Sequence, residues 1–223
     1  MEIMRMSNGA GTRIKRSRKK ILAAAEEVFL LHGFRGASMD AVADAAGVSK
    51  QTVYSHYKSK EALFLQVVEL MTGSAAHAIG EDLEDDFEGV TAEDFLIRAA
   101  IDQLLVVMTP RLMRLRRMVI GEVERFPDLG RLLHENGPQR SINRLAKAIT
   151  HYVDVGELRC ADPTSAARHL NWLVMGGPTN SAMMLGDVSI PTRPELEVHA
   201  QESIGIFLAA FGERPRTKTG HLA

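Results

Sequence analysis

The sequence predicts an all-α protein: an N-terminal three-helix head, joined by a long fourth helix to an all-helical body. Apolar residues recur with helical spacing in almost every segment. Alternating β-branched runs and the hairpin turns that would connect them are absent. The chain has 223 residues and is 45% hydrophobic, which is enough for a substantial core. These observations favour one large domain or two small ones.

Charge is distributed unevenly along the chain. Residues 1–64 contain 11 Lys and Arg against 6 Asp and Glu, whereas the remainder contains 16 against 22. A basic head on an acidic body predicts that the head meets a polyanion. Cys160 is the only cysteine, so no intrachain disulfide can form and a reducing compartment is expected. No stretch reaches the roughly 20 apolar residues that span a bilayer, and we therefore expect a cytoplasmic protein.

The head begins with a segment that favours a flexible arm, because residues 1–12 are rich in Gly, Asn and Ser. A first helix is predicted from about Ser17 to Leu31, ended by Gly33. Ser38 is placed to cap a second helix, which Gly47 terminates.

Two further caps follow in the head. Ser49 begins a very short third helix, and Ser59 begins a fourth that continues from about Lys60 towards Ile79. The acidic run at residues 81–89 then interrupts the pattern. A solvated loop explains this run better than a metal site, because it lacks the spacing of a calcium-binding loop.

The body is predicted to be helical throughout. Asp162-Pro163 begins one helix, since Asp caps and Pro fits the first position. Gly176-Gly177-Pro178 should kink or break that helix. The capping box at Thr192 and Glu195 opens a last helix that ends at Gly212. The other expected helices are Ala92–Met108, Arg111–Glu124 and Arg140–Val153, with a break over residues 126–138.

Two short helices joined by the residues AGVS, the second too polar for burial, describe a helix-turn-helix. Its second helix would enter the major groove of DNA with its first residues facing base edges. Lys50 can reach guanine acceptors, Gln51 can pair with adenine, and the Thr52 methyl can pack on thymine. Val53 should point into the core of the head.

The head resembles that of the TetR family of bacterial transcriptional regulators. The resemblance covers residues 12–65 and rests on an ordered series of motifs: AA-x-x-x-F, S-M-x-x-V-A-x-x-A-G-V-S and T-V-Y-x-H-Y-x-S-K-E-x-L. Residues 116–140 and 155–170 resemble, more loosely, the C-terminal domain of an AcrR- or AefR-like subgroup. The resemblance implies a bacterial, ligand-responsive repressor that binds a palindromic operator as a homodimer.

Motif positions imply which residues contact DNA. His56 and Tyr57 end the recognition helix and would reach phosphate, as would Lys60 at the start of the fourth helix. Ser55 departs from members that have a large aromatic residue there. The implied contacts are Arg13, Ser38, Lys50, Gln51, Thr52, Tyr54, Ser55, His56, Tyr57 and Lys60. A basic arm along or in the minor groove would comprise Arg13, Lys15, Arg16, Arg18, Lys19 and Lys20.

These assignments have simpler alternatives. Tyr54 can serve mainly as a packing residue, Ser38 and Ser49 can act only as caps, and individual arm residues can merely increase solubility. His56 as a metal ligand is disfavoured, because no partner has suitable spacing.

The body is expected to dimerise, since one short helix reads too few base pairs to find a single site. The resemblance implies that the last two helices pair with those of a second copy as a four-helix bundle. The alternative is that they close the monomer's own core. The interface candidates are Ala166, Leu170, Leu173, Leu196, Ile204, Phe207, Leu208 and Phe211.

The resemblance also implies a small, largely hydrophobic ligand inside the body. Methionine is an adaptable lining residue for such ligands, although each methionine could equally be ordinary core. The candidate lining residues are Phe95, Met108, Met113, Met118, Asn171, Trp172, Met175 and Met183. No metal and no cofactor are expected.

The expected domains are an arm at 1–12, a DNA-binding domain at 13–65, a regulatory and dimerisation domain at 66–212 and a disordered tail at 213–223. The main alternative function is an activator or an architectural DNA binder without a small-molecule ligand. An enzyme is disfavoured, because the sequence lacks the nucleophile-elbow, zinc-protease and dinucleotide-binding motifs.

Overall fold

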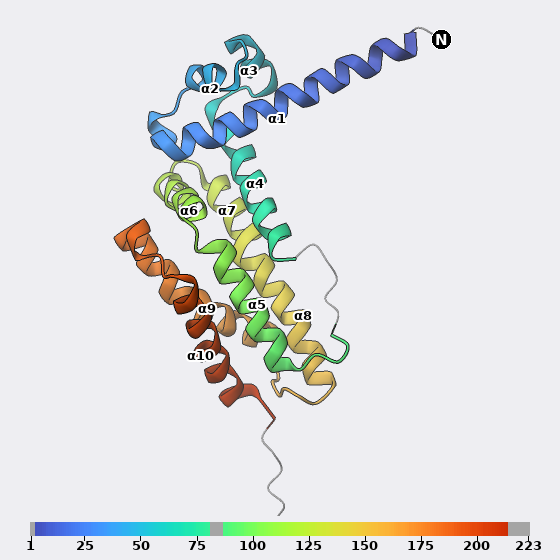
Figure 1. The fold of residues 1–223 in the computed structure, drawn as a ribbon, viewed down its shortest axis with the longest axis vertical. Coiled ribbons are helices and arrows are strands. Elements are labelled where there is room, and N and C mark those ends of the chain that lie inside the picture. The colour runs from blue at the N-terminus through green and yellow to red at the C-terminus, as the bar shows by residue number, and fades with distance from the viewer. Residues whose placement is uncertain (1–2, 81–86, 214–223) are drawn as a thin grey trace, which may run out of the picture. The chain divides into compact units, whose positions relative to one another are not determined.

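The computed structural model describes residues 3–80 and 87–213, and within these ranges the all-α fold class is confirmed (Figure 1). The described residues contain no β-strand beyond an isolated bridge between Leu158 and Gly212. Most of the expected acidic loop (81–86) and of the expected tail (214–223) lies outside the described residues. The chain divides into two compact units, residues 1–74 with 114–136 and residues 75–113 with 137–223.

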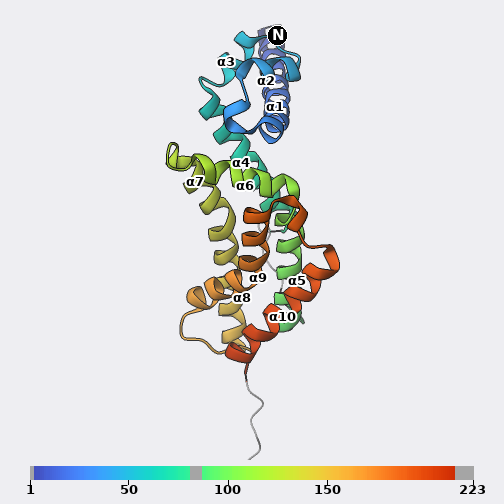
Figure 2. The ribbon, with the colours of Figure 1, turned by 90° about the vertical axis from the view of Figure 1, so that its left-hand side faces the viewer.

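Unit 1 contains the expected head together with residues 114–136, a later segment of the chain. Its helices are α1 (Ile3–Gly36), α2 (Met39–Ala46), α3 (Lys50–His56), most of α4 (Lys60–Ala78), the later part of α6 (Pro110–Glu122) and α7 (Pro127–His134). In Figure 2, α2 lies between α1 and α3, in agreement with the contacts that it makes with both.

The core of unit 1 is an aromatic cluster. Phe29 and Phe64 are fully buried, with ring centroids 4.8 Å apart. Phe34 packs against Phe64 at 5.2 Å and against Phe126 at 5.4 Å. Burying each such ring stabilises the fold by about 1.5–3 kcal/mol. Phe126 therefore brings the segment 114–136 into the core of unit 1, which extends beyond the DNA-binding domain expected at 13–65.

Helix α1 is longer than the sequence indicated. It begins at Ile3, so the residues expected to form a flexible arm continue the helix. Adding residues to an existing helix avoids the nucleation cost, and each glycine then costs only about 1 kcal/mol. The expected end at Gly33 is confirmed as a turn in the backbone, where the φ of Gly33 is 70°.

Unit 2 contains the remaining helices. They are α5 (Ala92–Val107), α8 (Arg140–Asp154), α9 (Pro163–Leu185) and α10 (Arg193–Phe211), together with the short 3-10 helix η2 (Asp187–Ser189). Helix α8 packs against α9, and α10 packs against both α5 and α9 (Figure 2). Tyr152 is fully buried in this unit, and its hydroxyl donates to the carbonyl of Val90 at 3.2 Å.

Of the kink or break expected at Gly176-Gly177-Pro178, the break is wrong, since α9 continues through these residues. Pro178 has no N–H to donate to the carbonyl of Val174, four residues earlier. His199 of α10 supplies the missing donor, with its Nε2 2.8 Å from that oxygen. The helix therefore continues because a neighbouring helix completes its hydrogen bonding.

The sequence also missed α7, because residues 126–138 contain two prolines and two glycines. Pro127 lies at the start of α7, where a missing N–H costs nothing. A short π-helical segment, η1 (Glu135–Gln139), accommodates the second proline.

Candidate nucleic-acid interface

The recognition helix α3 is held at both ends by local hydrogen bonds. Gly47 ends α2 with a φ of 64°, and its N–H bonds to the carbonyls of Ala43 and Asp44. The Ser49 hydroxyl then caps α3 by accepting from the N–H of Thr52 at 3.1 Å. Val53 is fully buried, as predicted. The turn and its anchor therefore determine which side chains of α3 face outward.

The outward face of α3 carries the residues that the sequence assigned to base contacts. Gln51 and Ser55 are exposed, Thr52 is half-exposed, and 41% of Tyr54 is accessible. Tyr54 is therefore partly accessible and partly packed, and its contact with DNA stays a prediction. Amide, hydroxyl and aromatic groups at neighbouring positions are the groups that read base edges in a major groove.

Lys50 is also exposed, but its ammonium has a partner in the absence of DNA. Its Nζ lies 2.8 Å from a carboxylate oxygen of Asp40 on α2. The hydrogen bond that the Lys50 ammonium donates to Asp40 raises the pKa of Lys50 above its ordinary value. An exposed pair of this kind contributes little to stability, so Lys50 can exchange Asp40 for a base or a phosphate at small cost.

Two hydroxyls of α3 are engaged within the helix itself. The Thr52 hydroxyl lies 2.8 Å from the Ser49 hydroxyl. The Ser55 hydroxyl donates to the carbonyl of Thr52 at 2.7 Å. A small residue at position 55 therefore reinforces the short helix.

Tyr57 and His56 lie at the end of α3 in different environments. Tyr57 is buried, and its hydroxyl accepts a hydrogen bond from the Nε of Arg18 at 3.3 Å. His56 is half-buried, with its ring 6.3 Å from that of Tyr57. Burial gives Tyr57 a structural role that the sequence did not predict.

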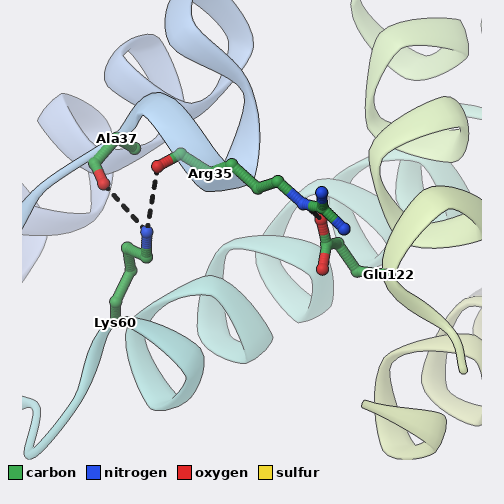
Figure 3. Close-up of polar contacts among 4 residues, drawn as sticks. All are labelled: Arg35, Ala37, Lys60 and Glu122. Carbon is green, nitrogen blue, oxygen red and sulfur yellow. Dashed lines mark hydrogen bonds and ion pairs between the residues drawn. The ribbon is translucent and has the colours of Figure 1, made fainter. Parts of the chain in front are cut away.

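The side chain of Lys60, at the start of α4, points toward the backbone of Arg35 and Ala37 (Figure 3). Its Nζ donates to the carbonyl of Ala37 at 3.0 Å and to that of Arg35 at 3.4 Å. The same ammonium lies 4.6 Å from the ring centroid of Phe34. Lys60 therefore binds the carbonyls that follow α1, and contact with a phosphate stays a prediction.

Ser38 is exposed at the N-terminus of α2. Its hydroxyl accepts from the N–H of Ala41 at 3.1 Å, which confirms the predicted cap. A capping hydroxyl at an exposed helix N-terminus can still meet a phosphate.

The six cations predicted to form a basic arm lie instead on the helix α1, and all are exposed. Arg18 uses its guanidinium within unit 1, donating to Tyr57 and, at 2.7 Å, to Gln66. Arg13, Arg16 and Lys20 recur with helical spacing along one side. A helix about 10–12 Å wide does not fit a minor groove about 6 Å wide. As a helix, this segment can reach a minor groove only with its side chains, and its contact with DNA stays a prediction.

An ion pair that the sequence did not indicate joins α6 to the end of α1. The Nε of Arg35 lies 2.8 Å from Oε1 of Glu122 (Figure 3). The Glu122 side chain is 8% exposed, whereas that of Arg35 is 80% exposed. Oε2 of Glu122 is buried without a hydrogen-bond partner among the described residues. No sequence signal could find this pair, because 87 positions separate its members.

Most of the predicted ligand-lining residues lie inside unit 2. Those buried there are Phe95, Met108, Met113, Asn171 and Met175, with Met183 partly buried against the same core. Met118 belongs to unit 1, and 46% of Trp172 is exposed. These two therefore do not share the interior of unit 2 with the others.

A buried amide pair lies among these apolar side chains. Nε2 of Gln103 on α5 donates to Oδ1 of Asn171 on α9 at 3.1 Å, and both residues are buried. One shared hydrogen bond leaves further donors and acceptors on both amides. Gln103 is a candidate ligand contact that sequence reasoning missed.

The predicted dimer residues lie mostly in the core of the chain itself. Ala166, Leu170, Leu196, Ile204 and Phe207 are buried. Leu208 and Phe211 are partly buried against that core, and Leu173 alone among the eight is exposed. The outer faces of α9 and α10 carry other apolar residues, among them Trp172, Met184, Leu185, Val198 and Ile206. These exposed faces of α9 and α10 therefore replace the predicted residues as the candidate dimer interface.

None of the helices in the described ranges has the length and apolar content needed to cross a membrane.

Comparisons with known proteins agree with this geometry. Residues 21–67 match the family described as bacterial regulatory proteins of the tetR family, and residues 94–213 match the AefR-like transcriptional repressor C-terminal domain. A crystal structure of a TetR-family transcriptional regulator from Mesorhizobium loti MAFF303099 is 34% identical, with a TM-score of 0.81, over 90% of this chain and 99% of that one.

Two further relatives carry more specific names. The flavonoid-responsive regulator FrrA is 30% identical, with a TM-score of 0.72, over 90% of this chain and all of its own. The transcriptional activator FasR of Mycolicibacterium smegmatis is 44% identical over 64 residues, which span 28% of this chain and 29% of FasR. This chain belongs to the TetR family of bacterial transcriptional regulators and carries its helix-turn-helix DNA-binding domain.

Proposed function

We propose that this regulator is a cytoplasmic repressor that binds a palindromic operator as a homodimer and is released by a small, largely hydrophobic ligand. The observation that carries the proposal is the outward face of α3, where Gln51 and Tyr54 are exposed beside Lys50 while Val53 anchors the helix. A seven-residue helix with this face suits insertion into a major groove.

Each exposed group on α3 has a distinct task. Gln51 pairs with adenine through its amide, and Lys50 leaves Asp40 to reach guanine or phosphate. The cations of α1 bind phosphates along the flanking backbone, which adds affinity without sequence preference. Specificity therefore depends on α3, and overall affinity depends on α1 as well.

Homodimerisation is supported by the exposed apolar faces of α9 and α10. Trp172 and Ile206 are 46% and 60% exposed, and neither closes the core of its own chain. Gly177 is exposed and Gly176 half-exposed, and both give a second copy's helices room to approach closely, because an added side chain at either position would meet nothing within its own chain. A two-fold dimer presents two α3 helices to half-sites one helical turn apart, about 34–36 Å, or a multiple of it.

The ligand is proposed to bind in the interior of unit 2. Met108, Met113 and Met175 provide adaptable apolar contacts. The amide pair of Gln103 and Asn171 offers hydrogen bonds to hydroxyl or carbonyl groups. The likeness to FrrA, which is named flavonoid-responsive, favours an aromatic ligand with such polar groups. A hundredfold loss of operator affinity requires a coupling free energy of about 2.7 kcal/mol.

A second candidate function is activation. The similarity to FasR, which is named an activator, favours it. Footprints separate the two functions, because a repressor site overlaps the start of transcription, whereas an activator site lies upstream of it.

The experiment begins with duplexes that the protein selects from a random pool, followed by footprinting on the selected sequence. We expect a protected palindrome, with affinity that falls steeply as salt rises. Gln51→Ala should change base preference at one position in each half-site. Equal affinity for selected and random duplexes would refute sequence-specific regulation, and a footprint without two-fold symmetry would refute the dimer.

A further inference from the structure

The α1–α2 corner, residues 33–38, is held from two helices that lie far from it in the sequence. The corner contains the turn at Gly33, the end of α1 and the cap of α2. One backbone hydrogen bond spans it, from the N–H of Ala37 to the carbonyl of Gly33 at 3.1 Å, and Phe34 packs into the aromatic core. Two charged side chains from other helices bind it as well, Lys60 from α4 and Glu122 from α6 (Figure 3).

Lys60 binds the backbone of the corner. Its ammonium donates to the carbonyls of Arg35 and Ala37 and lies over the ring of Phe34. A charged donor on two carbonyls, beside an aromatic face, fixes the corner against the start of α4.

Glu122 binds one side chain of the corner, that of Arg35. Its carboxylate is nearly buried at the end of α6, and the described residues offer it a single cationic partner, Arg35. The ion pair uses Nε of Arg35 and one carboxylate oxygen, whereas the other oxygen is buried and unpaired. A buried carboxylate without hydrogen bonds is energetically costly, and one oxygen of Glu122 already lacks a partner. The remaining bond to Arg35 is therefore strongly favoured. Arg35 is therefore held in place although most of it is exposed.

Both holding helices continue beyond unit 1. Helix α4 begins at Lys60 in unit 1 and ends at Ala78 in unit 2, and α6 begins at Pro110 in unit 2 and ends at Glu122 in unit 1. The corner is thus tied at the first residue of one connecting helix and the last residue of the other.

We propose that Glu122 is a positioning residue for DNA binding, which holds the α1–α2 corner through Arg35 and so sets the placement of α2 and of α3 packed against it. The inference rests on the proposed DNA-binding function. Glu122 itself does not touch DNA, because its carboxylate is buried. Its loss therefore affects the fit of α3 to its specific sequence more than the general attraction to phosphates.

Electrostatics and positioning predict opposite results for Glu122→Gln. Removing a negative charge from the head tightens binding to every DNA sequence alike. Loss of positioning instead weakens binding to the specific duplex alone. Glu124→Gln is the matched control, because Glu124 is exposed two residues further on and makes the same change of charge without contacting Arg35.

The test measures the dissociation constants for a duplex selected by the wild-type protein and for a random duplex of equal length, by fluorescence anisotropy at one salt concentration. We expect Glu122→Gln to lower the ratio of specific to random affinity about fivefold or more, the lower end of usual coupling between sites. Glu124→Gln should leave the ratio unchanged, and Arg35→Lys, which keeps the cation, should retain most of it.

If Glu122→Gln does not fold, the double variant Arg35→Met with Glu122→Leu removes both charges and fills the buried position, and the same fall in ratio is expected. A ratio that stays at the wild-type value in the folded variant overturns the proposal and leaves Glu122 only a structural role. A wild-type protein that prefers no duplex overturns both this proposal and the proposed function.

Discussion

Replacing His199 by alanine should destabilise the protein because of a proline on the neighbouring helix. The N–H that would bond the Val174 carbonyl is missing at Pro178, and His199 donates to that carbonyl at 2.8 Å. A carbonyl oxygen can only accept, so Nε2 of His199 carries a proton in this contact. Val174 is buried, and truncation of His199 therefore leaves its carbonyl unpaired, at a cost of about 1–3 kcal/mol.

The second perturbation, Pro178→Ala, restores a backbone N–H four residues after Val174. In that background α9 can bond its own carbonyl, and His199→Ala should cost about 1 kcal/mol less than in the wild type. Ser203→Ala is the matched control on α10. Its hydroxyl donates to the carbonyl of Leu173 at 3.4 Å, and Gly177, four residues after Leu173, keeps its N–H. The cost of Ser203→Ala should therefore not depend on position 178.

Urea denaturation of the wild type, the three single variants and the two double variants that contain Pro178→Ala, followed by circular dichroism, measures these differences. Protein concentration must be constant, because the stability of a dimer depends on it. Equal costs of His199→Ala in both backgrounds, within about 0.5 kcal/mol, would refute the reasoning, since independent sites add within that range. The hydrogen bond would then contribute to the contact between α9 and α10 without compensating for the proline.

Three further results are expected. Asp40→Asn should release Lys50 and lower its raised pKa towards the ordinary value. It should therefore tighten operator binding more than Asp44→Asn does, a control at an exposed position of the same helix. Equal operator affinities of the two variants in anisotropy titrations would contradict this. Ile206→Glu should convert the dimer to a monomer in light scattering coupled to gel filtration, whereas exposed Glu202→Gln should not. The hydrogen bonds that Thr192 donates to Glu195 lower the pKa of the Glu195 carboxyl. The ionised carboxylate therefore stabilises the start of α10 at neutral pH, and this stabilisation is lost as pH falls through the lowered pKa. The melting temperature of Glu195→Gln should fall less on acidification than that of the wild type.

The ends of the helices could be predicted well because their signals are local. Ser38, Gly47, Ser49 and the Thr192–Glu195 box act on residues within a few positions, and each is found where the sequence indicated. Val53 could be assigned to the core for the same reason, as a strongly apolar residue in a short polar helix. Capping and turn chemistry depend on sequence neighbours, which a single sequence displays completely.

The faces of α9 and α10 could not be assigned from periodicity. Both helices carry apolar residues on more than one side, so Leu170 and Leu173 fit either a monomer core or an interface. The structure buries Leu170 and exposes Leu173. Packing against α5 and α8, rather than the pattern of either helix, decides which side faces inward.

The sequence by itself determined the helical class, the caps and the side chains that α3 exposes, because these follow from short-range backbone and side-chain chemistry. Only the tertiary structure decided the roles of Lys60, Glu122 and His199. Each of them satisfies a charge or a carbonyl that lies 23 or more positions away. Such partners meet only when helices pack, and no local pattern records which donor will reach which acceptor.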